Sequence, residues 1–281
     1  MYKVSLHNHT TLSDGKTDME EIVLAAIERG FTHFGITDHV CTYGYEDHSL
    51  KPDKYDEYVD KVHELRDKYK DKIELFAGIE SERYSNRGYL VSDLSKIRPR
   101  LDYIVGSVHV TYPGEIMEPV DELCSTFRKS LERSYDNDAR KFVTDYFENY
   151  YNNLNELKPE VAGHIDLIKK NNIDGIFFDE SSSWYKDLVS DVLDKIKEID
   201  SVLELNTGGG YKHGVRSLYP SDVIIKMAKD KGVKFTMSSD AHNIEMLDVL
   251  YDLGVNRLKR AGINELYTYS NKERGFISFD I

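Results

Sequence analysis

The chain has 281 residues, 40% of them hydrophobic and 31% charged, which is ordinary for a globular protein and excludes a fibrous or disordered chain. It carries 50 acidic against 37 basic residues, a formal net charge of −13, and no basic tail or stripe stands out, which argues against long nucleic acid as a partner. There is no apolar run of the roughly 18 residues that a membrane span needs and no apolar leader, so we expect a cytoplasmic protein without a membrane partner.

Disulfides and thiolate metal sites are not expected, because the sequence has only two cysteines. The sequence also shows no internal repeat, low-complexity segment or Pro/Gly-rich linker. We therefore predict a single domain over residues 1–281.

The first strand-like run, residues 2–6, ends in His7-Asn8-His9, and Asp14 follows in a turn closed by Gly15. Side chains two apart on an extended backbone point the same way, so both imidazoles can face one metal ion. On its own such a pair is more often an incidental polar strand end. The rest of the chain has to supply the missing ligands.

Helices and strands alternate along the rest of the chain. Helical periodicity predicts helices at 17–29, 53–69, 138–157, 185–199 and 220–231, with another near the C-terminus. Strand-like segments fall at 2–6, 33–37, 73–79, 102–108, 160–163, 201–205, 233–237 and 265–269. This alternation predicts a parallel sheet.

Local signals mark some of the boundaries. Thr17 and Glu20 form a capping box for the first helix, Gly30 is a plausible stop for it, and Pro220 suits the first turn of a later helix. The polar segment 110–137 shows no clear periodicity, and we interpret it as an irregular insertion, a candidate lid. His33 stands at the start of its strand and is expected to be structural.

Chemistry-bearing residues gather at the ends of these strands. The predicted metal ligands are His7, His9, Asp14, His39, Glu80, His109, His164, Asp240 and His242. All of them except Asp14 lie at or just past the C-terminal end of a strand. In a β/α barrel these ends converge on one face, whereas an open sheet would spread them along a line, so a barrel explains the pattern better. Imidazole with carboxylate and without thiolate suits Zn, Fe or Mn.

Six motifs in this order make the chain resemble the polymerase and histidinol phosphatase (PHP) superfamily. They are His7-Asn-His9, Thr37-Asp-His39, Gly78-Ile-Glu80, Ser107-Val-His109, Gly163-His164-Ile-Asp and Ser239-Asp240-Ala-His242. The segment Glu204-Leu-Asn-Thr207, together with Arg216 and Tyr219-Pro-Ser221, is similar to the histidinol-phosphate phosphatase branch.

The resemblance implies a distorted (β/α)7 TIM-like barrel with the active site at the C-terminal strand ends and two or three divalent metal ions. Eight strand-like segments are predicted, so one of them would lie outside the barrel. By analogy, one metal would be held by His7, His9, Glu80 and Asp240, a second by Glu80, His109 and His164, and a third by Asp14, His39 and His242. Many relatives have histidine where this chain has Asp14.

The implied reaction is hydrolysis of L-histidinol phosphate to L-histidinol and phosphate by a metal-activated hydroxide, a step of histidine biosynthesis. We assign the catalytic roles to Glu80, as the bridging carboxylate, and to Asp14 and His39.

Substrate contacts are predicted from residue chemistry alone. Arg216, after the glycines 208–210, and Lys169 are candidates for the phosphate. Tyr43, Asp47 and Glu115 are candidates for the amine and imidazole of the substrate.

Two other functions stay open. The chain could act on another small phosphate monoester or a nucleotide, or it could be a non-catalytic metal-binding module. The apparently complete ligand set weighs against the module.

Overall fold

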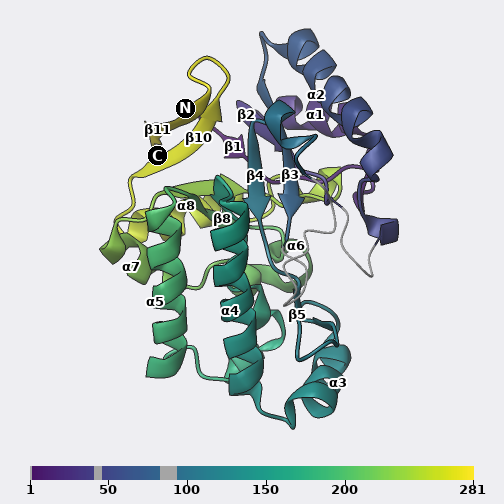
Figure 1. Ribbon diagram of the computed structural model, residues 1–281. Coiled ribbons are helices and arrows are strands. Elements are labelled where there is room, and N and C mark those ends of the chain that lie inside the picture. Colours follow the sequence, from purple (N-terminus) through teal and green to yellow (C-terminus); the bar gives the residue numbers. More distant parts are fainter. Residues whose placement is uncertain (1, 41–45, 83–93) are drawn as a thin grey trace.

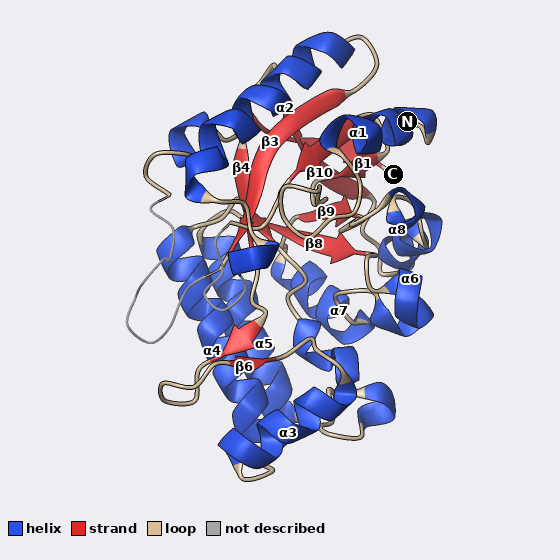
Figure 2. Cartoon of the chain, turned by 90° about the vertical axis from the view of Figure 1, so that its right-hand side faces the viewer, coloured by secondary structure: helices blue, strands red, loops and turns tan. Residues whose placement is uncertain are grey.

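Seven parallel strands form a nearly closed barrel surrounded by helices (Figures 1 and 2). The computed structural model describes residues 2–40, 46–82 and 94–281. The strands are adjacent in the order β1 (Val4–Ser5), β2 (His33–Ile36), β3 (Glu74–Ser81), β4 (Tyr103–Gly106), β7 (Val161–Ala162), β8 (Val202–Asn206) and β9 (Phe235–Ser238). Apart from Glu74 at the start of β3, their residues are all buried, as expected for a parallel sheet covered by helices. The predicted barrel of seven strands is therefore confirmed.

The barrel closes between its first and last strands, at their C-terminal ends. The Asp240 N–H donates to the His7 carbonyl at 2.9 Å, and the His9 N–H donates to the Ala241 carbonyl at 2.9 Å. Asn8 and Ala241 form a parallel bridge between the same two segments. Two predicted ligand motifs, 230 residues apart in the chain, thus become neighbouring strands.

The predicted helices lie close to their predicted positions, and α3 and α6 are two helices that the sequence analysis did not predict. Their bounds are α1 (Met19–Glu28), α2 (Tyr55–Tyr69), α3 (Cys124–Tyr135), α4 (Ala139–Leu157), α5 (Ser183–Glu198), α6 (Gly210–His213), α7 (Asp222–Lys231) and α8 (Tyr251–Arg260). Within the described ranges, none of them combines the length and apolar character needed to cross a bilayer.

Two predicted helix starts were wrong. Helix α1 is capped by Asp18, whose carboxylate accepts from the Glu20 N–H at 2.9 Å, and not by a Thr17–Glu20 box. Helix α7 begins after the cap residue Ser221, so Pro220 lies before the helix and not in its first turn. Gly30 ends α1 as predicted, with a positive φ of 76°.

The eighth predicted strand lies outside the barrel. β10 (Glu265–Ser270) pairs with β11 (Gly275–Asp280), a strand that the sequence analysis missed, in an antiparallel hairpin. Tyr267, Tyr269 and Phe276 of the hairpin pack on a barrel-interior cluster of Leu6, Phe76, Tyr103, Val105, Val161 and Val202. Figure 1 shows the hairpin near one end of the barrel, while the arrowheads of β3 and β4 point toward the other.

The segment 110–137 is more regular than expected. It contains β5 (Val110–Thr111), β6 (Glu118–Pro119) and α3, which contacts α4. Buried Glu118 receives hydrogen bonds from Arg133 and Ser134 at the end of α3. The segment lies on the side toward which β3 and β4 point (Figure 1), so it is an ordered addition beside the ligand-bearing strand ends.

Two buried tyrosines brace neighbouring strands just before the ligand positions. The Tyr58 hydroxyl of α2 lies 2.8 Å from the Ile36 carbonyl and 2.6 Å from the Gly78 carbonyl. The Tyr150 hydroxyl of α4 lies 2.5 Å from the Gly163 carbonyl and 3.3 Å from the Gly106 carbonyl. Each hydroxyl has one proton and can donate it to the carbonyl of either strand, so it connects the ends of two neighbouring strands.

Candidate metal centre

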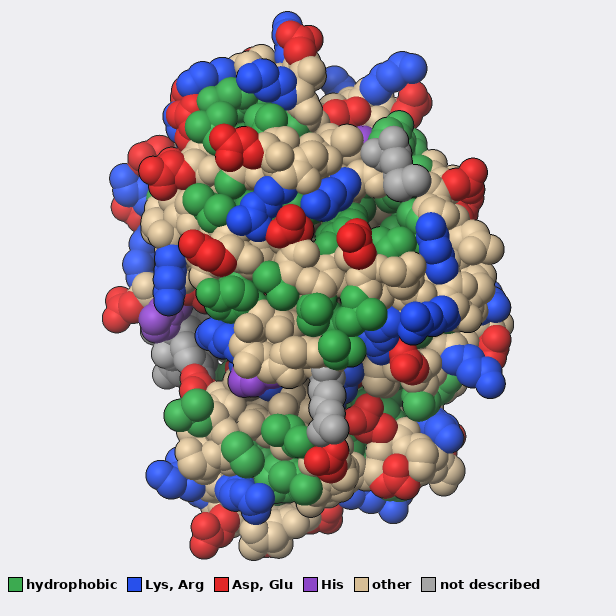
Figure 3. Space-filling view, turned by 180° about the vertical axis from the view of Figure 1, so that it is seen from behind, with side chains coloured by type: hydrophobic (Ala, Val, Ile, Leu, Met, Phe, Trp, Pro, Cys, Tyr) green, Lys and Arg blue, Asp and Glu red, His purple; other side chains and the backbone are tan. Residues whose placement is uncertain are grey.

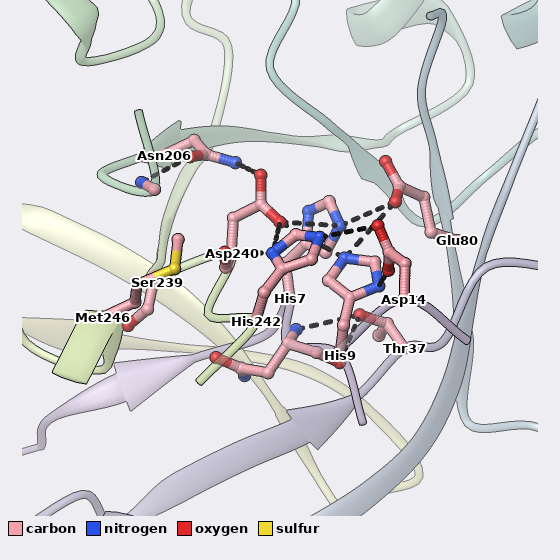
Figure 4. A network of polar contacts seen from close by, with 12 residues as sticks. His7, His9, Asp14, Thr37, Glu80, Asn206, Ser239, Asp240, His242 and Met246 are labelled. Atoms are coloured by element: carbon pink, nitrogen blue, oxygen red, sulfur yellow. Dashed lines mark hydrogen bonds and ion pairs between the residues drawn. The ribbon is translucent and has the colours of Figure 1, made fainter. Parts of the chain in front are cut away.

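The nine residues predicted as metal ligands form one connected cluster at the C-terminal ends of the strands. Figure 4 shows six of them: His7, His9, Asp14, Glu80, Asp240 and His242. Most of them lie just after the C-terminal end of a barrel strand. Glu80 is the next-to-last residue of β3, and Asp14 lies in the loop after β1. Short strands place their next residues at the barrel rim, where the backbone leaves the sheet and side chains can turn inward.

Glu80 lies at the middle of this cluster and is 2% exposed. Its Oε2 atom lies 3.1 Å from His7 Nε2 and 3.0 Å from His39 Nδ1. Its Oε1 atom lies 3.1 Å from His164 Nε2 and 3.6 Å from His109 Nε2. The two oxygens therefore face different sets of imidazoles, which is the arrangement that a bridging carboxylate needs.

Asp240 and Asp14 approach the two different ring nitrogens of His9. His9 Nε2 is 3.2 Å from Asp240 Oδ1, and His9 Nδ1 is 3.7 Å from Asp14 Oδ1. His242 Nε2 lies 3.2 Å from Asp14 Oδ2, and His39 Nε2 lies 3.8 Å from Asp14 Oδ1. Figure 4 shows the side chains of His9, Asp14, Asp240 and His242 directed toward one another.

Three groups of residues could each hold a metal ion, because within each group the donor atoms lie within 4.8 Å of one another. The groups are His9, Asp14, His39 and His242; His7, His9 and Asp240; and His39, Glu80 and His109. These groups resemble the three sets implied by the family resemblance, with three differences. His9 and His39 each belong to two groups, whereas Glu80 belongs only to the group of His39 and His109 and not to that of His7. His164 faces Glu80 Oε1 without joining a group.

The cluster fits metal ions better than it fits a purely hydrogen-bonded interior. Buried His7 Nε2, both ring nitrogens of His9, His164 Nδ1 and Asp240 Oδ1 have no hydrogen-bond partner in the described part of the chain. Buried polar atoms are normally satisfied, and unsatisfied ones in a native fold call for an explanation such as a bound ion. Imidazole nitrogens and carboxylate oxygens converging without thiolates are donors that Zn, Fe and Mn accept.

Opposite charges shift the pKa values of the cluster strongly. Burial raises the pKa of Glu80, but the imidazoles of His7, His39 and His109 outweigh burial and hold it well below its usual value. Burial lowers the pKa of His7, yet the carboxylates of Glu80, Glu204 and Asp240 raise it well above its usual value. His39 behaves differently, because burial dominates and lowers its pKa to about 4. The carboxylates thus make the pocket a favourable place for positive charge.

A buried aspartate organises the loop that carries Asp14. Asp38 is fully buried, and its carboxylate accepts from the Thr10 N–H at 2.7 Å and from the Ser13 hydroxyl at 2.6 Å. The Thr10 hydroxyl donates to the second oxygen at 2.7 Å. These bonds hold residues 10–13 against the end of β2, so that Asp14 faces His39 and His242.

Two hollows meet above the cluster and share Asp14, His39, His109 and Asp121 in their linings. The larger, of about 340 Å³, includes Lys16, Lys170, Lys212 and His213. The smaller, of about 250 Å³, includes Glu82, Asp121 and Glu122, and no Lys or Arg of the described residues lines it. Among the described residues, the lysines of the cleft therefore lie only in the larger hollow, called here the basic end, which also contains the carboxylates of Asp14, Glu80, Asp121 and Asp240. The smaller hollow, called here the acidic end, has only carboxylates and histidines as titratable side chains in the described part of the chain.

Of the residues predicted to contact the substrate, those that the structure describes do not line the cleft. Lys169 is nearly buried, donates to the Leu218 carbonyl at 2.9 Å and lies 3.1 Å from Asp166, so it lines neither hollow. Asp47 has a fully exposed side chain, and Glu115 is exposed on the turn between β5 and β6; neither lines the cleft. Tyr43 and the side chain of Arg216 lie outside the described residues. His33 is buried at the opposite end of its strand, as expected.

The sequence analysis missed the residues that line the cleft around the metal donors. Lys16 follows Asp14 by two residues, and Lys212 follows the glycines 208–210. Lys170 is next to Lys169, which was predicted to contact the phosphate. A usable signal was present, since each lies in the segment that follows the C-terminal end of a barrel strand. The choice between Lys169 and Lys170 depends on the turn that follows His164, which the sequence does not reveal.

Comparisons with known proteins agree with this architecture. The sequence profile described as "PHP domain" matches residues 5–208. The chain is 28% identical over 279 residues to a "Probable histidinol-phosphatase" of Schizosaccharomyces pombe, covering 94% of this chain and 88% of the relative. It is 23% identical over 273 residues to the histidinol-phosphatase of Bacillus subtilis, covering 92% of this chain and 100% of the relative.

A solved structure has the same fold. The histidinol phosphate phosphatase of Lactococcus lactis, determined in complex with zinc, L-histidinol and phosphate, superposes with a TM-score of 0.72 at 20% identity and covers 98% of both chains. The profile match covers more than half of the chain and includes the first five of the six motifs. The chain therefore belongs to the PHP domain family.

Proposed function

We propose that the chain is a metal-dependent phosphoric monoester hydrolase that converts L-histidinol phosphate to L-histidinol and phosphate in histidine biosynthesis. Curated relatives that align over nearly their whole length carry the name histidinol-phosphatase, which supports this assignment. The observation that carries it is the polarised cleft, because the substrate has a phosphate at one end and an amine and imidazole at the other.

The cofactors we propose are two or three divalent cations, Zn, Fe or Mn, held by the nine residues of the cluster. Zinc is present in the L. lactis relative. Bound metals would supply Lewis acidity, neutralising phosphoryl oxygens and lowering the pKa of a coordinated water. Glu80 would keep neighbouring cations close together, and Asp14 and His39 would complete the donor set on the solvent side, where they line both hollows.

The basic end of the cleft would bind the phosphate. Lys16, Lys170 and Lys212 come from three different segments that each follow a barrel strand, and they line one hollow beside the metal donors. Lysine ammonium groups offer point charges to phosphoryl oxygens, and they compensate for the carboxylates below them. The lysines would therefore hold the substrate with its phosphate beside the cluster, because the phosphorus atom must lie next to the metal donors.

The acidic end would bind the amine and the imidazole. Asp121 and Glu122 line the smaller hollow, and Glu82 lies at its base with 6% exposure. Asp121 also lies 3.4 Å from Lys170, so it stands at the junction between the two ends. A neutral sugar phosphate would leave these carboxylates without a cationic partner, which disfavours its binding.

The test is a phosphatase screen on metal-reconstituted protein with histidinol phosphate among sugar phosphates, nucleotides and an aryl phosphate. We expect kcat/KM for histidinol phosphate to exceed the others by at least tenfold. Equal rates for all monoesters would remove the substrate assignment and leave a general phosphoesterase. Absence of any turnover with full metal content would favour a non-catalytic metal-binding module.

Long nucleic acid fits the described surface less well. Figure 3 shows one face of the molecule, on which basic and acidic side chains are interspersed. Binding to a phosphate backbone needs clustered Lys and Arg, which this face does not present.

A further inference from the structure

Two buried residues of β8 lie behind the predicted ligands: Glu204 contacts His7, and Asn206 contacts Asp240. We propose that Glu204 and Asn206 are positioning residues that orient these two side chains for one metal ion. The inference rests on the proposed metal centre but not on the identity of the substrate. Both residues are fully buried.

Glu204 determines which nitrogen of His7 is available to a metal. His7 Nδ1 lies 2.9 Å from Glu204 Oε2, and a carboxylate oxygen can only accept, so the proton is on Nδ1. Nε2 is then the nitrogen left for a metal, and it faces Glu80 Oε2 at 3.1 Å and Asp240 Oδ1 at 3.8 Å. A carboxylate behind a metal-binding imidazole fixes its tautomer and its ring orientation.

Asn206 connects the same carboxylate to Asp240. Its Oδ1 atom accepts from the Gly208 N–H at 2.8 Å, so its amide nitrogen must point the other way. That nitrogen donates to Glu204 Oε1 and, at 3.0 Å, to Asp240 Oδ2. Figure 4 shows the Asn206 side chain reaching Asp240.

Asp240 is consequently left with one oxygen for the metal. Its Oδ2 atom is held by Asn206, while its buried Oδ1 atom has no hydrogen-bond partner among the described residues and lies 3.2 Å from His9 Nε2. Its backbone is held too, since its N–H donates to the His7 carbonyl at 2.9 Å. The free donor atoms of His7 and Asp240 therefore both point to the space beside His9.

The β8 register explains why these two residues can act together. Residues 204 and 206 are two apart on a strand and project to the same side, into the barrel mouth. If Glu204 and Asn206 only stabilised the fold, their hydrogen bonds would not need to leave a free donor atom on His7 and on Asp240. Both contacts do leave the metal-facing atom without a hydrogen bond to any described residue.

The test measures metal binding without substrate, which separates it from the assignment of the reaction. Glu204→Gln keeps shape and removes the charge, and we expect Co²⁺ and Zn²⁺ affinity, from chelator competition, to fall about 10- to 100-fold. The visible spectrum of the Co²⁺ form should change as well. Asn206→Ala should weaken binding in the same direction, and it serves as the second variant if Glu204→Gln does not fold.

A matched control is Glu118→Gln, which alters another buried glutamate that contacts Arg133 and not the cluster. It should leave metal affinity unchanged. In a double-mutant cycle, Glu204→Gln should add little to the loss caused by His7→Gln, because Glu204 acts through His7. Unchanged affinity in both single variants, or additive losses in the cycle, would overturn the proposal.

Discussion

At the scale of single residues, Glu80 is the group on which the centre depends most, because five imidazoles surround its two oxygens. Glu80→Gln removes the charge that would hold two cations together. We expect metal content to fall by at least one ion per chain and kcat to fall at least 100-fold. Elemental analysis and steady-state kinetics would measure the two effects.

The matched control for that change lies on the same strand. Glu74 begins β3 at the opposite end, with its side chain 38% exposed, and Glu74→Gln should keep full metal content. Full stoichiometry in the Glu80 variant would contradict the bridging assignment.

Substitutions at the two ends of the cleft should distinguish recognition of the substrate amine from binding of the phosphate. Asp121→Asn removes a carboxylate from the acidic end, and a lost hydrogen bond to a charged group costs about 1.5–3 kcal/mol. The kcat/KM for histidinol phosphate should therefore fall roughly tenfold or more, and that for p-nitrophenyl phosphate much less.

Lys212→Ala provides the contrast, because Lys212 lies at the basic end. It should lower kcat/KM for both esters, since both contain the phosphate. Equal losses for both esters in the Asp121 variant would argue against amine recognition at that residue.

At the scale of secondary-structure elements, helices α2 and α4 support the ligand-bearing ends of neighbouring strands. Tyr58→Phe and Tyr150→Phe would each remove a buried hydroxyl that donates to a strand carbonyl. We expect each to lower the free energy of unfolding by about 1–3 kcal/mol in urea denaturation. Tyr151→Phe, one position along α4 and 38% exposed, should change it by less than about 0.5 kcal/mol.

At the scale of the whole molecule, metal binding should stabilise the barrel, because the donors come from six of its seven strands or the loops after them, and from segments near both ends of the chain. At a hundredfold excess over Kd, a ligand that binds only the folded state contributes about 2.7 kcal/mol. For a chain of this size we expect Tm to rise by about 5 °C on adding Zn²⁺ or Mn²⁺ to the metal-free protein.

Thermal unfolding with and without a chelator would measure the shift. The Glu80→Gln variant should show a smaller rise than the unmodified chain. A Tm independent of metal concentration would indicate that the cluster is satisfied without ions.

Much of the fold could be predicted because its signals are local. Helices α2, α4 and α5 start and end within two residues of the predicted positions, since apolar side chains recur at helical spacing there. The errors fell where tertiary contacts decide the outcome. Segment 110–137 becomes ordered through contacts of α3 with α4 and through buried Glu118, which no short-range pattern predicts.

The sequence by itself determined which residues could bind metal and at which end of each strand they stand, because residue type and strand periodicity are properties of the chain. The tertiary structure alone decided their grouping, through closure of β1 on β9, and it turned Lys169 away from the cleft while leaving Lys170 in it. Closure and side-chain direction depend on contacts between segments as distant as His7 and Asp240. Local sequence patterns carry no information on such contacts.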